Sequence, residues 1–344
     1  MAIAEQKKDA PRRFYLITYP RTASNLLVRI LNLMEQPDVE PKGKSAGYFF
    51  MDAMTKRWGM QLESKPMDDW TEEERNSLKE AYQQCVDEFV KYLDDAEAHG
   101  KIAFIKEHAF FMGDPTQQWQ MLHPGNKVNE PRWTMGVPER YGKTQTHSDL
   151  NNTVFPDEFL RLFKPIFLVR HPALMFSSLF RASRDIVTEV GPQEEGRFAV
   201  HSASVRQIYK WFEEQFEQTR SADPNDGEGD WPVILDADDV INDPGVILRL
   251  CELTGLDKTK LRYEWDKAKK DEIEELDKPA QRMLSTLNAS NGIMKEKTAG
   301  TVDIDAEVKK WEVEFGEETA AIIEKAVRDA MPFYEYMKAR RLRA

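Results

Sequence analysis

The chain has 344 residues, of which 41% are hydrophobic and 31% charged, and its formal net charge is −12 at pH 7. This composition predicts a globular protein with an ample core and excludes an intrinsically disordered chain. The acidic balance argues against nucleic acid as a partner, because phosphate contacts require a basic face. A local cluster of cations can still hold a small anionic ligand.

The chain shows no run of about 18 apolar residues, so no membrane-spanning helix is expected. Its amino-terminal stretch lacks the apolar region of a secretory signal. Cys85 and Cys251 are too few for a disulfide framework or a zinc site. These features predict a cytoplasmic protein with no membrane partner and no metal.

Apolar runs, helical periodicity and turn residues predict strands and helices that alternate along the chain. A capping box formed by Thr71 and Glu74 marks the start of the longest helix. The predicted elements are a strand at 14–19, a helix at 24–34, a helix at 70–98, a strand at 101–108, a strand and helix within 164–183, a helix at 201–220, a strand at 231–240, a helix at 243–256 and a helix from about 305 to 330.

The predicted strands are continuous apolar runs, which is typical of a parallel sheet with helices on both faces and predicts the α/β class. No composition break divides the chain, so residues 1–344 are expected to form one domain. Residues 113–157 are rich in glycine and proline and are expected to form a lid or an insertion. A helical segment is expected at about 257–340. Ligands of such sheets bind at the carboxyl ends of the strands.

The first strand runs into a polar turn with the sequence TYPRTASN at residues 18–25. Such a turn presents free backbone N–H groups and the positive end of the helix dipole, and both favour an anion. Thr22, Ser24 and Asn25 add side-chain donors, and the Arg21 guanidinium suits phosphate or sulfate oxygens. The glycines and lysine of a Walker A loop are absent, which disfavours a nucleoside triphosphatase. The alternative is an ordinary turn whose polar residues only cap the helix.

Two further polar clusters follow predicted strands. Lys106 and His108 are two residues apart and so face the same side, where a histidine can act as a general base. Arg170 ends a strand, and Ser178 falls eight residues later, about two turns into the next helix. The alternatives are a packing histidine, and an arginine that pairs with a nearby acid while the serine bonds its own helix.

Together the three clusters resemble the sulfotransferase family that uses 3′-phosphoadenosine 5′-phosphosulfate (PAPS). The family's loop Y-P-K-S-G-T-T-W is matched by residues 19–26, and its catalytic K-x-H by residues 106–108. Its R-x-P signature with a later serine is matched by Arg170, Pro172 and Ser178. The chain is most similar to the divergent soluble microbial or fungal type. The resemblance implies a P-loop-like three-layer sandwich.

The chain also departs from the family pattern at several positions. Arg21 replaces the loop lysine, and Ala23 replaces a glycine, which is acceptable only if its φ is negative. Leu26 replaces the loop tryptophan, so the adenine has to stack on another residue. The family's carboxyl-terminal R-K-G is absent, and Lys295 and Lys297 are the substitutes expected to hold the 3′-phosphate.

The resemblance implies an in-line sulfonyl transfer without a metal. His108 would remove the acceptor's proton, and Arg21 and Lys106 would stabilise charge on the transferring group. The loop residues Thr22, Ala23, Ser24 and Asn25 would hold the 5′-phosphate. Arg170 and Ser178 would bind the 3′-phosphate of PAPS and of its product, adenosine 3′,5′-bisphosphate (PAP).

Aromatic residues near these clusters are expected to line an acceptor pocket: Phe49, Phe50, Trp58, Phe110, Phe111 and Tyr141. They favour a small hydrophobic or aromatic alcohol or phenol as acceptor, although any one of them can instead belong to the core. The sequence leaves room for a homodimer. Two other functions remain open: a dehydratase or lyase that sulfonates an alcohol and eliminates sulfate, and a non-catalytic protein that binds PAPS or PAP.

Overall fold

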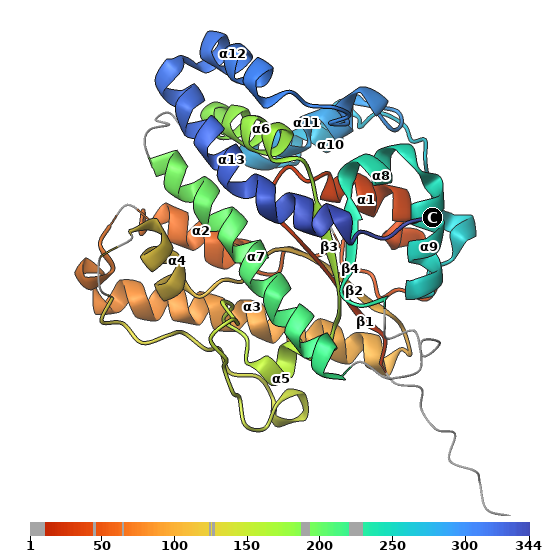
Figure 1. Ribbon diagram of the computed structural model, residues 1–344. Coiled ribbons are helices and arrows are strands. Elements are labelled where there is room, and N and C mark those ends of the chain that lie inside the picture. The colour runs from red at the N-terminus through yellow and green to blue at the C-terminus, as the bar shows by residue number, and fades with distance from the viewer. Residues whose placement is uncertain are drawn as a thin grey trace, which may run out of the picture.

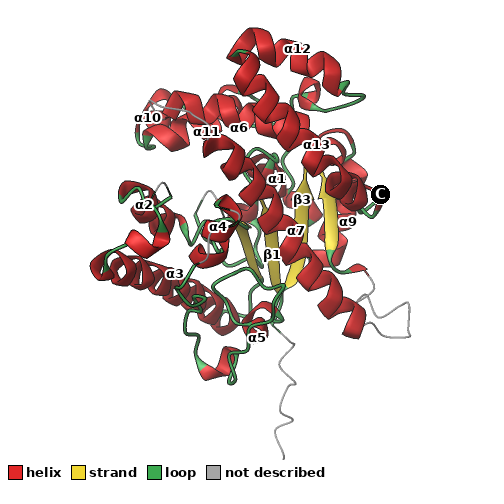
Figure 2. Cartoon of the chain, turned by 60° about the vertical axis from the view of Figure 1, so that its left-hand side comes forward, coloured by secondary structure: helices red, strands yellow, loops and turns green. Residues whose placement is uncertain are grey.

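Four parallel strands form the central sheet of the computed structural model, which describes residues 11–43, 46–63, 65–123, 125, 128–186, 193–219 and 230–344. The strands are β1 (Arg13–Thr18), β2 (Ala103–His108), β3 (Lys164–Val169) and β4 (Val233–Asp236). Their order across the sheet is β2-β1-β3-β4, and every neighbouring pair runs parallel (Figure 2). The carboxyl ends of β1, β2 and β3 therefore meet at one edge of the sheet.

Helices cover both faces of the sheet (Figure 1). They are α1 (Ser24–Leu31), α2 (Met51–Gly59), α3 (Glu72–Ala98), α4 (Pro115–Leu122), α5 (Asp157–Leu160), α6 (Pro172–Ile186), α7 (Gln193–Thr219), α8 (Ala237–Asn242), α9 (Pro244–Thr254), α10 (Lys270–Glu274), α11 (Lys278–Ala289), α12 (Ile304–Phe315) and α13 (Glu317–Ala339). No helix among these described residues is long and apolar enough to cross a bilayer.

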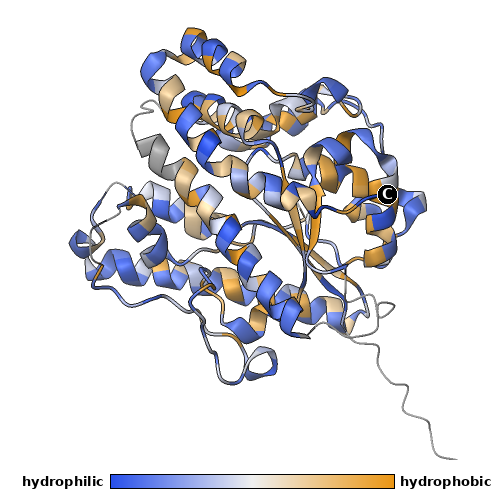
Figure 3. Ribbon diagram, in the orientation of Figure 1, coloured by the Kyte–Doolittle hydropathy of each residue, from blue (hydrophilic) through white to orange (hydrophobic). Residues whose placement is uncertain are grey.

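The sheet separates two hydrophobic cores, because successive strand residues point to opposite faces. Tyr15 and Ile17 of β1 pack on the face covered by α2, α3, α6, α7 and α13. Phe14 and Leu16 pack on the face covered by α1, α8 and α9. The hydrophobic residues concentrate on the strands and on the inward sides of the helices (Figure 3). The expected α/β fold with three layers is confirmed.

Several predicted element boundaries differ from the structure for local reasons. The strand predicted at 231–240 ends at Asp236, whose side chain accepts a hydrogen bond from Asp238 N at 2.8 Å and caps α8. The last predicted helix is two helices, α12 and α13, which Gly316 separates at φ 87°. The predicted capping box of α3 is confirmed, with reciprocal hydrogen bonds between Thr71 and Glu74. Residue 220 of the predicted helix 201–220 lies outside the described residues.

The segment 113–157 is built into the main core, apart from residues 124, 126 and 127, which lie outside the described part of the chain. Trp119, Trp133 and Phe155 are buried there. The buried Asn151 donates from Nδ2 to Phe155 O at 2.8 Å, which ties the segment to itself. This packing does not support a freely moving lid, because opening would expose large aromatic side chains. The expectation of an insertion in a single domain stays a prediction.

Both outer strands of the sheet have a further neighbour from the same chain. Beside β2, Lys106 N donates to Ala46 O at 2.8 Å, and Tyr48 N donates to Lys106 O at 3.0 Å. Beside β4, Leu342 N donates to Ile234 O at 2.8 Å. Residues 46–48 and the carboxyl-terminal tail thus lie along opposite edges of the sheet.

Candidate active site

The turn between β1 and α1 contains two residues in the left-handed region. Arg21 has φ 69° and Ala23, the N-cap of α1, has φ 66°. The condition for an unstrained alanine, a negative φ at Ala23, is therefore not met, and its Cβ is strained where the related loops carry glycine. Thr22 is buried, and its hydroxyl donates to Tyr19 O at 2.9 Å. The side chain of Thr22 thus closes the turn and leaves ligand contacts to backbone N–H groups and to other side chains.

Arg21 joins the turn to two helices. Its Nε donates to Ser178 Oγ of α6 at 3.0 Å, and its Nη1 donates to Met283 O of α11 at 2.7 Å. Burial and the neighbouring cation Arg170 lower the pKa of Arg21 to about 10, so the guanidinium stays charged at neutral pH. The first and third predicted clusters are therefore in direct contact.

Arg170 lies beside Arg21 and is only partly satisfied. Its Nη1 donates to Arg21 O at 2.9 Å and its Nη2 donates to Lys297 O at 2.7 Å. Its Nε is buried without a hydrogen-bond partner among the described residues. Two half-buried guanidinium groups side by side, one of them with an unused donor, fit an anionic ligand. Lys295 and Lys297 are exposed, and Lys297 contributes its backbone carbonyl here.

Lys106 connects the second cluster to the turn. The side chain is fully buried, its Nζ donates to Asn25 Oδ1, and Nζ lies 4.1 Å from the centre of the Tyr48 ring. Burial lowers the pKa of Lys106 to about 7, and the neighbouring Glu107 opposes this shift. The ammonium therefore stands next to the predicted anion site with its charge poised near neutral pH.

His108 is held at both ring nitrogens. Nδ1 lies 2.7 Å from Thr18 Oγ1, and Nε2 lies 3.2 Å from the Tyr48 hydroxyl. Because the Thr18 hydroxyl donates to Glu107 O at 3.3 Å, it accepts from Nδ1–H, which leaves the Nε2 lone pair directed at Tyr48. Burial lowers the pKa of His108 well below its usual range, and the neighbouring Lys106 and His201 lower it further. The ring is therefore neutral at pH 7. A neutral imidazole whose Nε2 lone pair accepts a hydrogen bond is in the protonation state that a general base requires.

Comparisons with known proteins decide the family. Over 341 residues the chain is 39% identical to sulfotransferase ppzF of Metarhizium majus (strain ARSEF 297), covering 97% of this chain and 98% of that protein. Sulfotransferase ppzF of Metarhizium rileyi (strain RCEF 4871) is 39% identical over 339 residues, covering 97% of both chains. The chain belongs to the sulfotransferases.

Two other comparisons add no weight to this assignment. No family model matches the chain. The sulfotransferase domain of the Synechococcus PCC 7002 olefin synthase aligns with 87% of this chain and 91% of that domain at 14% identity and a TM-score of 0.40.

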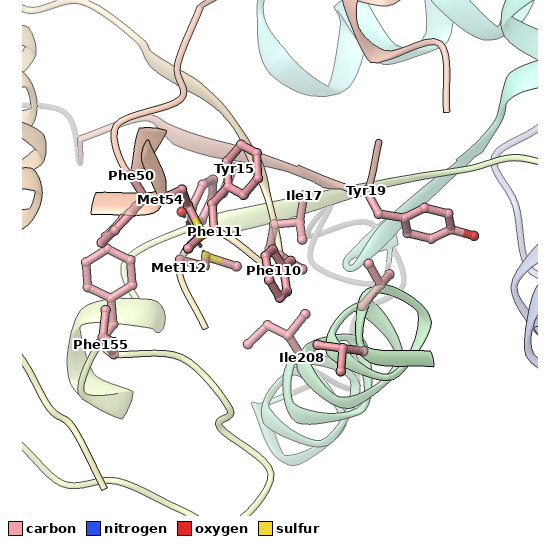
Figure 4. Packing of buried hydrophobic residues seen from close by; sticks show 14 of the residues in the cluster. Tyr15, Ile17, Tyr19, Phe50, Met54, Phe110, Phe111, Met112, Phe155 and Ile208 are labelled. Atoms are coloured by element: carbon pink, nitrogen blue, oxygen red, sulfur yellow. Dashed lines mark hydrogen bonds between the residues drawn. The ribbon is translucent and has the colours of Figure 1, made fainter. Parts of the chain in front are cut away.

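In this sulfotransferase the predicted aromatic residues divide between the site and the core. The Phe111 ring centre lies 5.1 Å from that of His108, and Trp58, which is 41% exposed, packs edge-on against Phe111. Phe110 lies between Ile17 of β1 and Ile208 of α7 (Figure 4).

Three of the predicted pocket residues point elsewhere. Phe49 stacks on Phe89 of α3, and Phe50 packs edge-on against Phe155. Tyr141 lies beside Arg13 at the opposite, amino-terminal end of β1. The structure does not bring these three residues to His108, because they complete the main core.

Tyr48 faces the site together with Phe111, whereas the residues predicted from the same aromatic run are its neighbours Phe49 and Phe50. The run YFFM at 48–51 does not show which ring faces β2. The position follows from Gly47, where an added Cβ would lie 1.8 Å from Lys106 O. This close approach lets the backbone of residues 46–48 lie against β2 and turns the Tyr48 side chain towards His108.

Glu107 lies between Lys106 and His108 in sequence but serves the fold. Its carboxylate accepts from His108 N at 3.0 Å and from Phe50 N at 3.3 Å. Burial raises the pKa of Glu107 to about 8. Among the described residues, no group of three or more His, Cys, Asp or Glu side chains is arranged to hold a metal ion.

Proposed function

We propose that this sulfotransferase transfers the sulfonyl group of PAPS to a hydroxyl of a small hydrophobic or aromatic acceptor, an alcohol or a phenol. One observation carries the proposal: the Nε2 lone pair of a neutral His108 faces the Tyr48 hydroxyl, and the Lys106 ammonium beside Tyr48 contacts Asn25 of the anion-binding turn. A base and an anion site in contact are what transfer to a hydroxyl requires.

The residues that would hold the donor come from the segments that follow β1 and β3. The backbone N–H groups of residues 22–25 and the Asn25 side chain suit the 5′-phosphate, at the amino terminus of α1. Arg170, with its unused Nε donor, and Ser178 suit the 3′-phosphate, with Arg21 between the two phosphate positions. Bound PAPS supplies an electrophilic sulfur with a phosphate leaving group.

The chain's own groups handle the charge and the proton. Lys106 stabilises negative charge on the transferring group and on the leaving phosphate, where a buried ammonium is most effective. His108 Nε2 takes up the proton of the acceptor hydroxyl. Replacing a positioned general base commonly costs about 10²–10⁴ in rate.

The acceptor class rests on the side chains around His108. Phe111 and Tyr48 flank the imidazole, and Trp58 continues the aromatic surface towards solvent. An aromatic or hydrophobic alcohol or phenol suits such an environment better than a sugar polymer, which would require an exposed polar or basic groove.

The donor assignment is tested by calorimetric titration of PAP, ATP and adenosine 5′-phosphosulfate. We expect micromolar binding that is selective for PAP and is lost in Arg170→Ala. Arg140→Ala, which removes an exposed arginine paired with Asp94, serves as the charge-matched control and keeps full affinity. Equal binding of ATP, or undiminished binding by Arg170→Ala, would contradict the proposal.

A further inference from the structure

The Tyr48 hydroxyl is in hydrogen-bond contact with His108, the general base of the proposed function. Both ring nitrogens of His108 are already taken, Nδ1 by Thr18 at 2.7 Å and Nε2 by the Tyr48 hydroxyl at 3.2 Å. His108 is only 6% exposed. The Tyr48 oxygen therefore occupies the position from which an acceptor hydroxyl would hydrogen-bond to Nε2 directly.

We propose that Tyr48 is a catalytic residue that relays the acceptor's proton to His108. The inference rests on the proposed function. The acceptor O–H donates its proton to Tyr48 Oη, while the Tyr48 proton moves to His108 Nε2. The acceptor oxygen forms the new bond to sulfur, and the bond between sulfur and the 5′-phosphate oxygen breaks with its electron pair on PAP. Tyr48 is neutral before and after the step.

The surroundings of Tyr48 fit a relay in which both protons move together. Burial raises the pKa of Tyr48, with a smaller contribution from Glu107, so the hydroxyl does not ionise alone. The Ser24 and Asn25 side chains and the Arg21 guanidinium act in the opposite direction and lower the pKa of Tyr48, because the hydroxyl lies next to the anion-binding turn. The Lys106 ammonium faces the ring at 4.1 Å and favours negative charge that develops there.

The backbone holds Tyr48 in this position at the expense of local strain. Ala46 and Tyr48 have φ values of 57° and 61° in the left-handed region. Hydrogen bonds of 2.8 and 3.0 Å to the two backbone groups of Lys106 fix the segment against β2. Strain of this kind persists where the surrounding structure enforces it, and it clusters at functional sites.

The test compares Tyr48→Phe, His108→Ala and the double variant, with PAPS and a series of substituted phenols as probe acceptors. Tyr48→Phe keeps the ring against Lys106 and removes only the hydroxyl. A relay predicts that each single variant loses about 10²–10⁴ in kcat/KM and that the double variant loses no more, because the two groups act as one unit. The loss should shrink for the most acidic phenols, which need less help from a base.

Two controls separate the relay from a loss of structure. PAP binding by Tyr48→Phe should match the wild type. Tyr92→Phe removes another buried tyrosine hydroxyl, which donates to Glu40 O at 2.8 Å away from His108, and should keep full activity. Turnover by Tyr48→Phe within twofold of wild type, or a further loss in the double variant, would overturn the relay.

A second readout does not depend on turnover. In an NMR titration of the His108 imidazole, Tyr48→Phe should raise the pKa of His108, because the neutral ring loses its hydrogen-bond donor at Nε2. An unchanged pKa would overturn the proposal even if no probe phenol is sulfonated. Failure of the wild type to sulfonate any probe, with PAP still bound, would count against the proposed acceptor and leave the relay to be decided by this titration.

Discussion

Lys106 shows how burial sets the working range of a charged residue. In the proposed mechanism its ammonium stabilises negative charge, and the buried position lowers its pKa to about 7. In the free enzyme the charge is therefore present below that pH and is lost as the pH rises through it. We expect kcat/KM for PAPS to fall above about pH 7, by about tenfold per pH unit.

Lys106→Arg tests this cause, because a guanidinium keeps its charge above pH 7. The variant is expected to have a lower kcat/KM than the wild type, but this value should stay constant from pH 7 up to about pH 9. Lys210→Arg on the exposed side of α7 is the matched control and should reproduce the wild-type profile. A basic limb that stays near pH 7 in Lys106→Arg would show that another group titrates.

Ala23 carries strain that a single substitution can relieve. It is the N-cap of α1 at φ 66°, where a Cβ costs about 1–2 kcal/mol and glycine is well tolerated. Ala23→Gly is expected to raise the free energy of unfolding by up to about 1 kcal/mol in urea titrations, since glycine also makes the unfolded chain more flexible.

The control for this substitution is Ala306→Gly in the exposed first turn of α12, which should lose about 1 kcal/mol because its backbone is ordinary helix. If Ala23→Gly destabilises the protein as much as the control does, the left-handed conformation at Ala23 is not the source of strain. Ala23→Val should lower both stability and PAP affinity.

At the level of elements, the segment beside β2 is the most sensitive part of the site. An added Cβ at Gly47 would lie 1.8 Å from Lys106 O, so Gly47→Ala has to push residues 46–48 away from β2. We expect a loss of about 1–3 kcal/mol in stability and a large loss of sulfonyl transfer, because Tyr48 moves with the segment.

Gly59→Ala, at the last residue of α2, gives the matched comparison. Apart from its chain neighbours and the adjacent backbone of α2, no atom lies within 4 Å of the position of its added Cβ, so the variant should keep wild-type activity and at least wild-type stability. Thermal unfolding and turnover of the two variants would be measured side by side. Equal melting temperatures and equal turnover of Gly47→Ala and Gly59→Ala would mean that the close approach of Gly47 to β2 is not required for stability or activity.

Much of the site could be predicted at this scale because it is built from strand ends. The residues that follow β1, β2 and β3 converge in any parallel sheet, so Arg21, Lys106, His108 and Arg170 could be placed together from the sequence. Tyr48 could not, because its position depends on the fit of Gly47 against the backbone of another strand. The same limit applies to 113–157, whose many glycines and prolines concealed side chains that fill the core.

For the whole molecule, the carboxyl-terminal helix α13 packs against α6, α7, α12 and the strands β3 and β4. The side of α13 that includes Ile323, Val327 and Met337 is buried. Tyr334 donates to Asp236 Oδ2 at 2.8 Å, which satisfies a buried carboxylate at the end of β4. We expect removal of residues 317–344 to abolish the cooperative thermal transition, because a large apolar surface on α6 and α7 is uncovered.

Removal of residues 341–344 alone is the milder comparison. It deletes the ion pair between Arg341 and Asp239 and the hydrogen bond from Leu342 N to Ile234 O. This shorter deletion should lower the melting temperature but leave one cooperative transition. An unchanged transition in the chain ending at residue 316 would show that α13 is dispensable for folding.

The cover on the two outer strands also limits how copies of this protein can associate. A bare edge strand offers unpaired N–H and C=O groups that recruit a strand from another molecule. Here residues 46–48 occupy β2 at Lys106, and Leu342 occupies β4 at Ile234. At these positions the sheet cannot be extended by a strand of a second chain. The same cover protects the sheet against fibril-like growth, and loss of the carboxyl-terminal tail would remove that protection from β4.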